Sequence, residues 1–167
     1  MKADPADVQL LDSARSATLA TISPSGLPRL VPVCFVAVSD PEAEHGIRIY
    51  SALDHKPKRV SEPRWLARAR DIAADPRVSL LVDRWSEDWS KLSWLRLEGV
   101  ASLIAPDAPG GEHAAALSAL RRRYPQYLEQ DLETRPVMRI TLRRVTGWSA
   151  ASTHLLSAPA GTACLPS

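Results

Sequence analysis

The amino-acid sequence predicts a mainly β domain of the α+β class, a small antiparallel barrel of six strands with helices around it. Short segments of β-branched and apolar residues succeed one another with turn signals between them, the pattern of consecutive hairpins. Helical segments do not alternate regularly with these strands, which disfavours a doubly wound parallel sheet. With 167 residues, the chain is long enough for one domain to bury a core without metals or disulfides.

The first part of the chain reads as a helix followed by a β-hairpin. An Asp-Pro pair, typical of a helix start, precedes apolar residues at helical spacing and predicts a helix over residues 5–15. A Ser-Pro-Ser-Gly turn joins strands predicted over residues 18–22 and 28–38. Proline cannot donate to a strand ladder, so Pro32 places the second strand at a sheet edge, at a bulge or beside a ligand.

The remaining elements follow from apolar patterning and helix-stop signals. Four further strands are predicted over residues 47–51, 77–83, 93–104 and 136–145, and two helices over 63–74 and 112–124. Gly99 is expected to mark a β-bulge. In the last strand Met138, Ile140 and Leu142 alternate with polar residues, which predicts that one face of this strand is buried.

Composition limits the domain count, the compartment and the cofactor chemistry. Residues 1–156 are expected to form one domain, and the small-residue segment 157–167 a flexible tail. The longest apolar stretch, residues 31–38, contains a proline and is far shorter than the ~20 residues of a membrane helix. The polar N-terminus does not resemble a signal peptide, so a cytoplasmic protein with no membrane partner is expected. Two cysteines and four scattered histidines predict neither a disulfide framework nor a metal site.

Charge is distributed unevenly along the chain. The formal net charge is +2, but residues 55–70 contain six basic side chains and one acidic side chain. A local positive segment on a nearly neutral protein favours a small anionic ligand over a nucleic acid, whose binders are usually basic over a whole face. A solvated helix face is the alternative interpretation of the same residues.

The sequence contains no self-contained catalytic motif. Its seven glycines form no Gly-x-Gly-x-x-Gly fingerprint, and there is neither a phosphate-loop motif nor a Gly-x-Ser-x-Gly nucleophile elbow. Glu87 and Asp88 are adjacent carboxylates in an expected surface loop, and Cys34 has no histidine near it in sequence, so no catalytic role is assigned to these residues. If the protein is an enzyme, a bound cofactor is expected to supply the chemistry.

Several short segments, taken in their order along the chain, carry a family resemblance. They are the hairpin over residues 17–33, then Ile49-Tyr50-Ser51, Lys56-Pro57-Lys58-Arg59, Asp75-Pro76-Arg77-Val78-Ser79-Leu80-Leu81-Val82, Leu97-Glu98-Gly99-Val100-Ala101 and Arg144-Val145-Thr146-Gly147-Trp148. Together they resemble the pyridoxamine 5′-phosphate oxidase-like split β-barrels over roughly residues 5–150. Within that family the chain is most similar to the actinobacterial branch that uses the deazaflavin coenzyme F420.

The resemblance implies a six-stranded antiparallel split β-barrel of the FMN-binding type, a homodimer with two cofactor sites at the subunit interface. In such proteins the second strand lines the cofactor ring, and the matching residues are Arg29, Leu30, Val31, Pro32, Val33 and Cys34. The family's next stretch, which contacts the ring or the ribityl chain, corresponds to Tyr50, Ser51 and Ala52. Its phosphate-binding stretch corresponds to Lys56, Lys58 and Arg59, in agreement with the local positive charge.

Three tryptophans close together in the sequence have two interpretations. Trp85, Trp89 and Trp94 lie within ten residues of one another. Their aromatic faces could wall a tricyclic ring from the partner subunit and exclude water from hydride chemistry. They could instead pack the dimer interface, where tryptophan is also enriched. A site at an interface could use both.

The chain departs from pyridoxamine phosphate oxidases at their substrate motifs. Their Arg-x-x-x-Leu-Lys run ends here in Cys34, and their Arg-Gln-Val-Arg run appears as Ser93-Trp94-Leu95-Arg96. Their C-terminal Arg-x-His motif is missing. Oxidation of vitamin B6 is therefore not expected.

The leading hypothesis is an oxidoreductase that binds coenzyme F420 and passes hydride to an unsaturated small-molecule acceptor. The alternatives are an FMN-dependent oxidase or reductase of the same fold, and a non-catalytic carrier of such a coenzyme. The sequence identifies no catalytic residue, and water and Tyr50 are the candidate proton donors.

Overall fold

The structure is a computed structural model that describes residues 5–53 and 67–151. Within these residues the helices are α1 (Pro5–Ser13), α2 (Ala67–Ala74) and α3 (Glu112–Arg123), with short 3-10 helices η2 (Trp89–Lys91) and η3 (Pro125–Glu129). The strands are β1 (Ala17–Ile22), β2 (Pro28–Val33), β3 (Val36–Ser39), β4 (Ile47–Ala52), β5 (Arg77–Arg84), β6 (Ser93–Ile104) and β7 (Val137–Ser149). The chain is thus mainly antiparallel β with three α-helices, as predicted.

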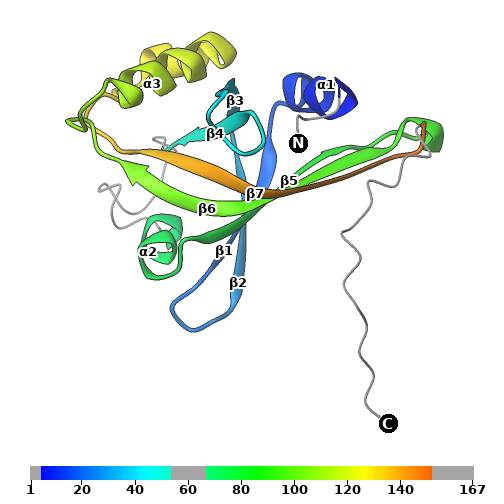
Figure 1. The fold of residues 1–167 in the computed structure, drawn as a ribbon, viewed down its shortest axis with the longest axis horizontal. Coiled ribbons are helices and arrows are strands. Elements are labelled where there is room, and N and C mark those ends of the chain that lie inside the picture. The colour runs from blue at the N-terminus through cyan, green and yellow to red at the C-terminus, as the bar shows by residue number, and fades with distance from the viewer. Residues whose placement is uncertain (1–4, 54–66, 152–167) are drawn as a thin grey trace.

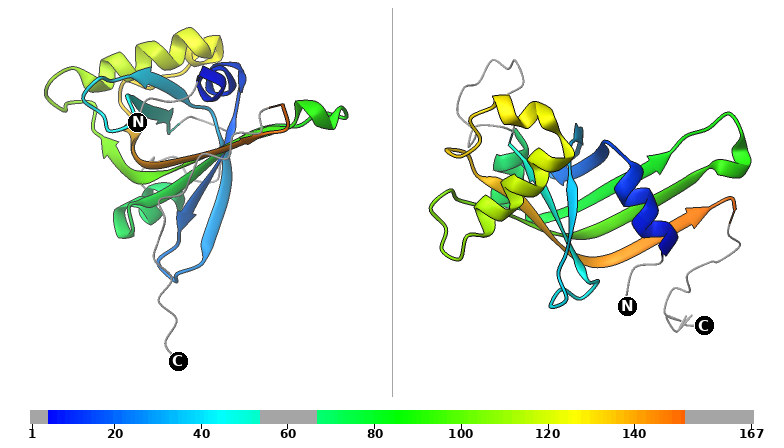
Figure 2. Two further views of the ribbon diagram at one scale, coloured as in Figure 1. Left: turned by 45° about the vertical axis from the view of Figure 1, so that its right-hand side comes forward. Right: turned by 90° about the horizontal axis from the view of Figure 1, so that it is seen from above.

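All strands belong to one antiparallel sheet with the order β2-β1-β5-β6-β7-β4-β3. The long strands β5, β6 and β7 run past the rest of the sheet as an arm that ends in η2 (Figure 1). Helices α3 and α2 lie on opposite sides of this sheet, and α1 lies on the side of α3 (Figures 1 and 2).

The structure has seven strands, not the six predicted, because the strand expected over residues 28–38 is divided. Its first part, β2, pairs with β1, while its second part, β3, pairs with β4 at the other end of the strand order. Between them lies Phe35, which is fully buried. The Tyr124 hydroxyl donates to the Phe35 carbonyl at 2.7 Å and accepts from the Phe35 amide at 3.1 Å. A side chain thus satisfies the backbone groups that a continuous strand would have paired with another strand.

Two predictions about special residues in strands are confirmed. Strand β2 pairs only with β1 among the described strands, so Pro32 lies on an edge strand. The β6–β7 register shifts between Glu98 and Gly99, which is the predicted bulge. A Cβ atom at Gly99 would lie 2.2 Å from the Thr141 carbonyl oxygen, so the close approach of the two backbones requires glycine.

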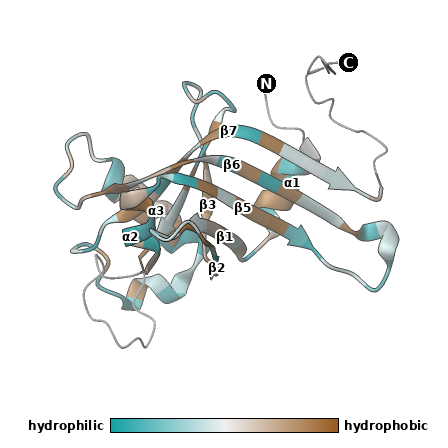
Figure 3. Cartoon of the chain, turned by 90° about the horizontal axis from the view of Figure 1, so that it is seen from below, coloured by the Kyte–Doolittle hydropathy of each residue, from teal (hydrophilic) through white to brown (hydrophobic). Residues whose placement is uncertain are grey.

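The buried apolar side chains form two main clusters. One is contributed mainly by the strands, and the other contains the buried residues of α3. Met138, Ile140 and Leu142 are buried in alternation along β7, as predicted. Alternating hydropathy is visible along β5, β6 and β7 in Figure 3. The apolar face predicted for the second long helix is also buried, and its residues are Ala116, Leu117, Leu120 and Tyr124.

Several predicted boundaries differ from the structure. Helix α1 ends at Ser13 rather than residue 15, and β7 continues to Ser149 rather than ending at 145. The predicted loop around the tryptophans contains η2, whose start is capped by the Asp88 side chain. The predicted helix over 63–74 is described only from Ala67, and the whole of the predicted tail lies outside the described residues, as does the end of the predicted domain.

None of the described helices has the length and apolar character needed to cross a bilayer. In the ranges 5–53 and 67–151, no group of three or more His, Cys, Asp or Glu side chains is placed to hold a metal ion.

Candidate cofactor-binding site

The edge strand β2 presents an exposed surface with both apolar and charged side chains. Leu30 is 66% exposed and the Arg29 side chain 43% exposed, whereas Val33 at the end of the strand is buried. Pro32 is exposed and Val31 half-buried. Arg29 and Leu30 are consecutive in the strand, so their side chains point to opposite faces of the hairpin, and β2 exposes a cation on the face of α2 and an apolar group on the other.

Helix α2 holds this strand through a buried carboxylate. Asp71 is completely buried, and its carboxylate accepts from the Thr21 hydroxyl at 2.7 Å. It also accepts from Arg29 Nη1, at 2.8 Å on one oxygen and 3.0 Å on the other. Two strands of the hairpin, β1 and β2, are therefore tied to α2 by one charged group, which the sequence analysis did not single out.

The same helix contacts the end of β4. Arg68 is 7% exposed, and its Nη2 donates to the Ala52 carbonyl at 3.2 Å. Ser51 and Ala52 are themselves buried. Arg68 and Asp71 are three residues apart, so they share one face of the helix. Helix α2 thereby joins two predicted cofactor-contacting stretches, residues 29–34 and 50–52.

The three predicted phosphate-binding residues, Lys56, Lys58 and Arg59, lie outside the described residues. They belong to the segment that connects Leu53, just after β4, to the start of α2. The segment therefore begins directly after the end of β4, which Arg68 of α2 contacts, and ends where α2 itself begins.

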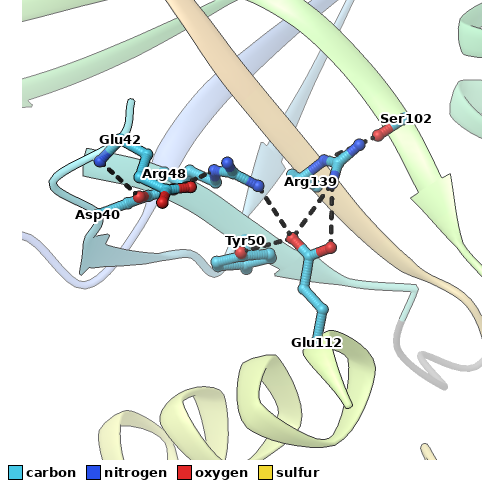
Figure 4. Close-up of polar contacts among 7 residues, drawn as sticks. All are labelled: Asp40, Glu42, Arg48, Tyr50, Ser102, Glu112 and Arg139. Carbon is cyan, nitrogen blue, oxygen red and sulfur yellow. Dashed lines mark hydrogen bonds and ion pairs between the residues drawn. The ribbon is translucent and has the colours of Figure 1, made fainter. Parts of the chain in front are cut away.

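Tyr50 points toward α3 and takes part in a polar cluster with the first residue of that helix (Figure 4). Its hydroxyl donates to Glu112 Oε1 at 2.7 Å, and Arg139 Nη1 donates to the same carboxylate at 3.0 and 3.3 Å. Arg48 Nη1 lies 3.5 Å from Glu112 Oε1, and its Nε pairs with Asp40. Through these contacts the first residue of α3 is bound to side chains of β4 and β7.

Burial and hydrogen bonding shift the proton equilibria of this cluster. Burial and, secondarily, the hydrogen bond to Glu112 raise the pKa of Tyr50 to about 12. Burial alone would raise the pKa of Glu112, but the Tyr50 hydroxyl and Arg139 outweigh it and lower that pKa below its ordinary value. The Tyr50 proton is directed at Glu112, and Tyr50 is a weaker acid than an ordinary tyrosine. Both features count against Tyr50 as the proton donor.

The four tryptophans in the described part of the chain lie on the arm formed by β5, β6 and β7. Trp85 and Trp89, near its tip, are 69% and 70% exposed. Trp94 is half-buried and stands opposite Trp148 in the β6–β7 register, where Trp148 is 45% exposed. The sequence analysis did not include Trp148 among the site residues, because only the strand register brings it beside Trp94.

One chain does not bring all the predicted residues together. The arm tip that carries Trp85 and Trp89 lies well away from the β1–β2 hairpin in each of the ribbon views (Figures 1 and 2). Cys34, just after β2, is half-buried and packs against the core under α3. Helix α2 links β2 to the end of β4, whereas Tyr50 is directed at Glu112 and the tryptophan arm is a separate exposed surface.

A family model described as pyridoxamine 5′-phosphate oxidase matches residues 3–149, nearly the whole chain. No curated protein matches the chain. The conserved hypothetical protein Rv2991 from Mycobacterium tuberculosis has a similar structure, with 25% identity and a TM-score of 0.65, over 96% of this chain and 93% of that one.

Three less similar structures share the fold and bind different cofactors by their names. A FAD-binding protein from Mesorhizobium loti has 22% identity and a TM-score of 0.58, over 84% of this chain and 89% of that one. An F420 reductase has 22% identity and a TM-score of 0.52, over 83% and 94%. The heme storage protein HutZ from Vibrio cholerae has 14% identity and a TM-score of 0.61, over 89% and 95%. At these identities the likeness establishes the fold alone.

Proposed function

This chain belongs to the pyridoxamine 5′-phosphate oxidase family, and we propose that it is an oxidoreductase that binds coenzyme F420. In this proposal the bound coenzyme supplies a hydride to an unsaturated small-molecule acceptor. The chain's own residues hold the coenzyme, orient its ring and keep water away from it. An FMN-dependent reaction on the same surface is the second candidate, because the family's own description is that of an oxidase.

The observation that carries the proposal is the joining of β2 and the end of β4 by helix α2. Through Asp71 and Arg68 this helix contacts both stretches that the family resemblance assigns to the cofactor. Strand β2 offers Arg29 for an anionic group on the face of α2, and Leu30 for an apolar part of the ligand on the opposite face. The basic segment leaving β4 supplies further cations for a phosphate. An apolar contact and several cations are the chemical groups that a ring with a phosphate-bearing side chain requires.

A homodimer is part of the proposal, supported by the tryptophan arm. Trp85 and Trp89 expose large aromatic surfaces, which monomeric proteins seldom leave in water. In one chain they are remote from β2, so only a second copy can bring them to a cofactor on that strand. Such a contact would cover the aromatic surface and exclude water from the ring in one step.

Heme is a third cofactor known from proteins with this fold, but the described residues lend it little support. His45 is 9% exposed and His113 5% exposed, and His113 Nε2 hydrogen-bonds the Arg135 carbonyl. Neither described histidine is placed to reach an iron at the surface.

The test is a titration of the purified protein with coenzyme F420, FMN and heme, followed by tryptophan fluorescence. Micromolar binding of F420, with FMN and heme at least tenfold weaker, supports the proposal. Preference for FMN makes the protein a flavin enzyme, and preference for heme refutes an oxidoreductase of this type. Turnover with a panel of conjugated acceptors then separates an enzyme from a non-catalytic carrier.

The chain offers a matched pair of variants for locating the site. Leu30 on β2 and Leu128 in η3 are 66% and 67% exposed, so Leu30→Glu and Leu128→Glu carry the same chemical change at equal exposure. We expect Leu30→Glu to weaken F420 binding at least tenfold, and Leu128→Glu to leave it within twofold. Equal effects of the two variants would refute the placement of the ring on β2.

A further inference from the structure

The Asp71 carboxylate holds Arg29 from the α2 side of the β1–β2 hairpin. It is fully buried, and it bonds Thr21 Oγ1 at 2.7 Å and Arg29 Nη1 at 2.8 and 3.0 Å. A carboxylate buried without partners is strongly unfavourable, so these bonds are kept as long as the hairpin and α2 stay packed. The position of Arg29 Nη1 is therefore set from within the protein.

Only one of the three guanidinium nitrogens of Arg29 is used in this way. Both bonds to Asp71 come from Nη1, and in the ranges 5–53 and 67–151 no partner contacts Nη2 or Nε. The side chain is 43% exposed. Because a guanidinium is planar, fixing one nitrogen restricts the direction of the other N–H groups. Its remaining donors are available to pair with an oxyanion such as phosphate.

We propose that Asp71, supported by Thr21, is a positioning residue that orients Arg29 to bind the phosphate of an anionic ligand. Asp71 does not touch the ligand and acts only through Arg29. The proposal rests on the cofactor site proposed for β2, and it extends that site to a residue of α2.

Asp71 can also affect the affinity for an anion in the opposite direction. As a nearby negative charge, Asp71 lowers the positive potential at Arg29 and weakens the binding of an anion. As a positioning group it strengthens binding, because an arginine already held in place loses less side-chain freedom when the ligand arrives. Replacing Asp71 by the isosteric asparagine therefore tightens phosphate binding in the first case and weakens it in the second.

The experiment follows the Nε–Hε signals of ¹⁵N-labelled arginines while inorganic phosphate is added to the full chain. The Arg29 signal is identified by its loss in Arg29→Gln. We expect phosphate to shift this signal in the native protein and to bind about fivefold more weakly to Asp71→Asn. Unchanged or tighter binding to Asp71→Asn would overturn the proposal.

A double-mutant cycle separates positioning from a general structural effect. If Asp71 acts through Arg29, Asp71→Asn has no further effect on phosphate affinity in the Arg29→Gln protein. A loss of the same size in both backgrounds would refute the proposal. Glu133→Gln is the matched control, because it removes another carboxylate that an arginine, Arg121, binds through two nitrogens, and we expect it to leave phosphate affinity unchanged.

Two further arrangements keep the result interpretable. If Asp71→Asn does not fold, Thr21→Val removes one bond to the carboxylate without removing its charge, and should weaken phosphate binding about twofold; no change would count against the proposal. A phosphate response at Arg29 without any flavin or F420 binding would refute the proposed function and leave this inference standing. Coenzyme binding without a phosphate response at Arg29 would refute this inference and leave the proposed function standing.

Discussion

Two ion-paired clusters in this protein contain the same kinds of side chain but leave different groups exposed to solvent. In each, a carboxylate on a helix accepts from an arginine on a strand, as Asp71 does from Arg29 and Glu112 from Arg139. Asp71 is fully buried while the Arg29 side chain is 43% exposed, so only the positive partner of this pair reaches solvent. Glu112 and Arg139 are both 30% exposed, and the Tyr50 hydroxyl and a second arginine also face the carboxylate.

The difference lies in what remains free after pairing. In the Glu112 cluster Arg139 also reaches Ser102, and Arg48 also pairs with Asp40, so the donors are directed inward and join α3 to the sheet. In the Asp71 cluster one arginine nitrogen is held and the others are not. The first arrangement stabilises a helix, whereas the second prepares a cation for a ligand.

The largest effect on stability is expected at Arg29. Arg29→Ala leaves the buried Asp71 carboxylate without a cation, and we expect a loss of about 3 kcal/mol in the free energy of unfolding at neutral pH. Urea denaturation measures it. Arg29→Lys keeps the charge and should lose less. If the two variants lose equally, the charge of the pair does not account for the stability.

The Glu112 cluster is expected to contribute less, because its members are partly solvated. Glu112→Gln removes the acceptor for Tyr50 and two arginines, and we expect a loss of about 2 kcal/mol at neutral pH, measured by urea denaturation. Because the pKa of Glu112 is lowered in the folded state, the stability it provides is lost as pH falls through that pKa. The difference between the native protein and Glu112→Gln should therefore shrink as pH falls below about 4.3, the ordinary pKa of glutamate. A constant difference down to pH 3 would contradict this account.

The hydrogen bond from Tyr50 is expected to have a smaller effect, with its own pH range. Tyr50→Phe should lose about 1.5 kcal/mol at neutral pH, since the acceptor is charged. Because the pKa of Tyr50 is raised to about 12, the bond's contribution is complete below about pH 10 and disappears as pH rises toward 12. Thermal unfolding of both proteins from pH 8 to 12 tests this. The difference should fall to nothing at the upper end, and persistence of the difference there would refute it.

The smallest effect is expected at an exposed ion pair. Arg77 binds Asp75 through two nitrogens, but its side chain is 73% exposed. We expect Arg77→Ala to leave the unfolding midpoint unchanged within error, because exposed pairs contribute little. A loss as large as that of Glu112→Gln would show that burial is not what distinguishes the clusters.

Sequence reasoning recovered the local features of the fold and only part of the candidate site. The hairpin turn and the bulge at Gly99 were predictable, and Pro32 limited its strand to an edge, a bulge or a ligand contact, since each depends on the conformational limits of the residue itself. Asp71 was not singled out, because in sequence it is one acidic residue in a helix. Only its burial and its contact with Arg29, 42 positions away, give it significance.

Taken alone, the sequence determined the α+β class, most strand positions and the family. Turn residues and apolar alternation act over a few neighbouring positions, so they can be read directly from the chain. The tertiary structure decided that residues 28–38 form two strands, because Tyr124 reaches Phe35 across 89 positions. It also decided that Tyr50 faces Glu112, 62 positions away, and that Asp71 supports Arg29. Such contacts depend on the packing of helices against the sheet, which no local pattern in the sequence specifies.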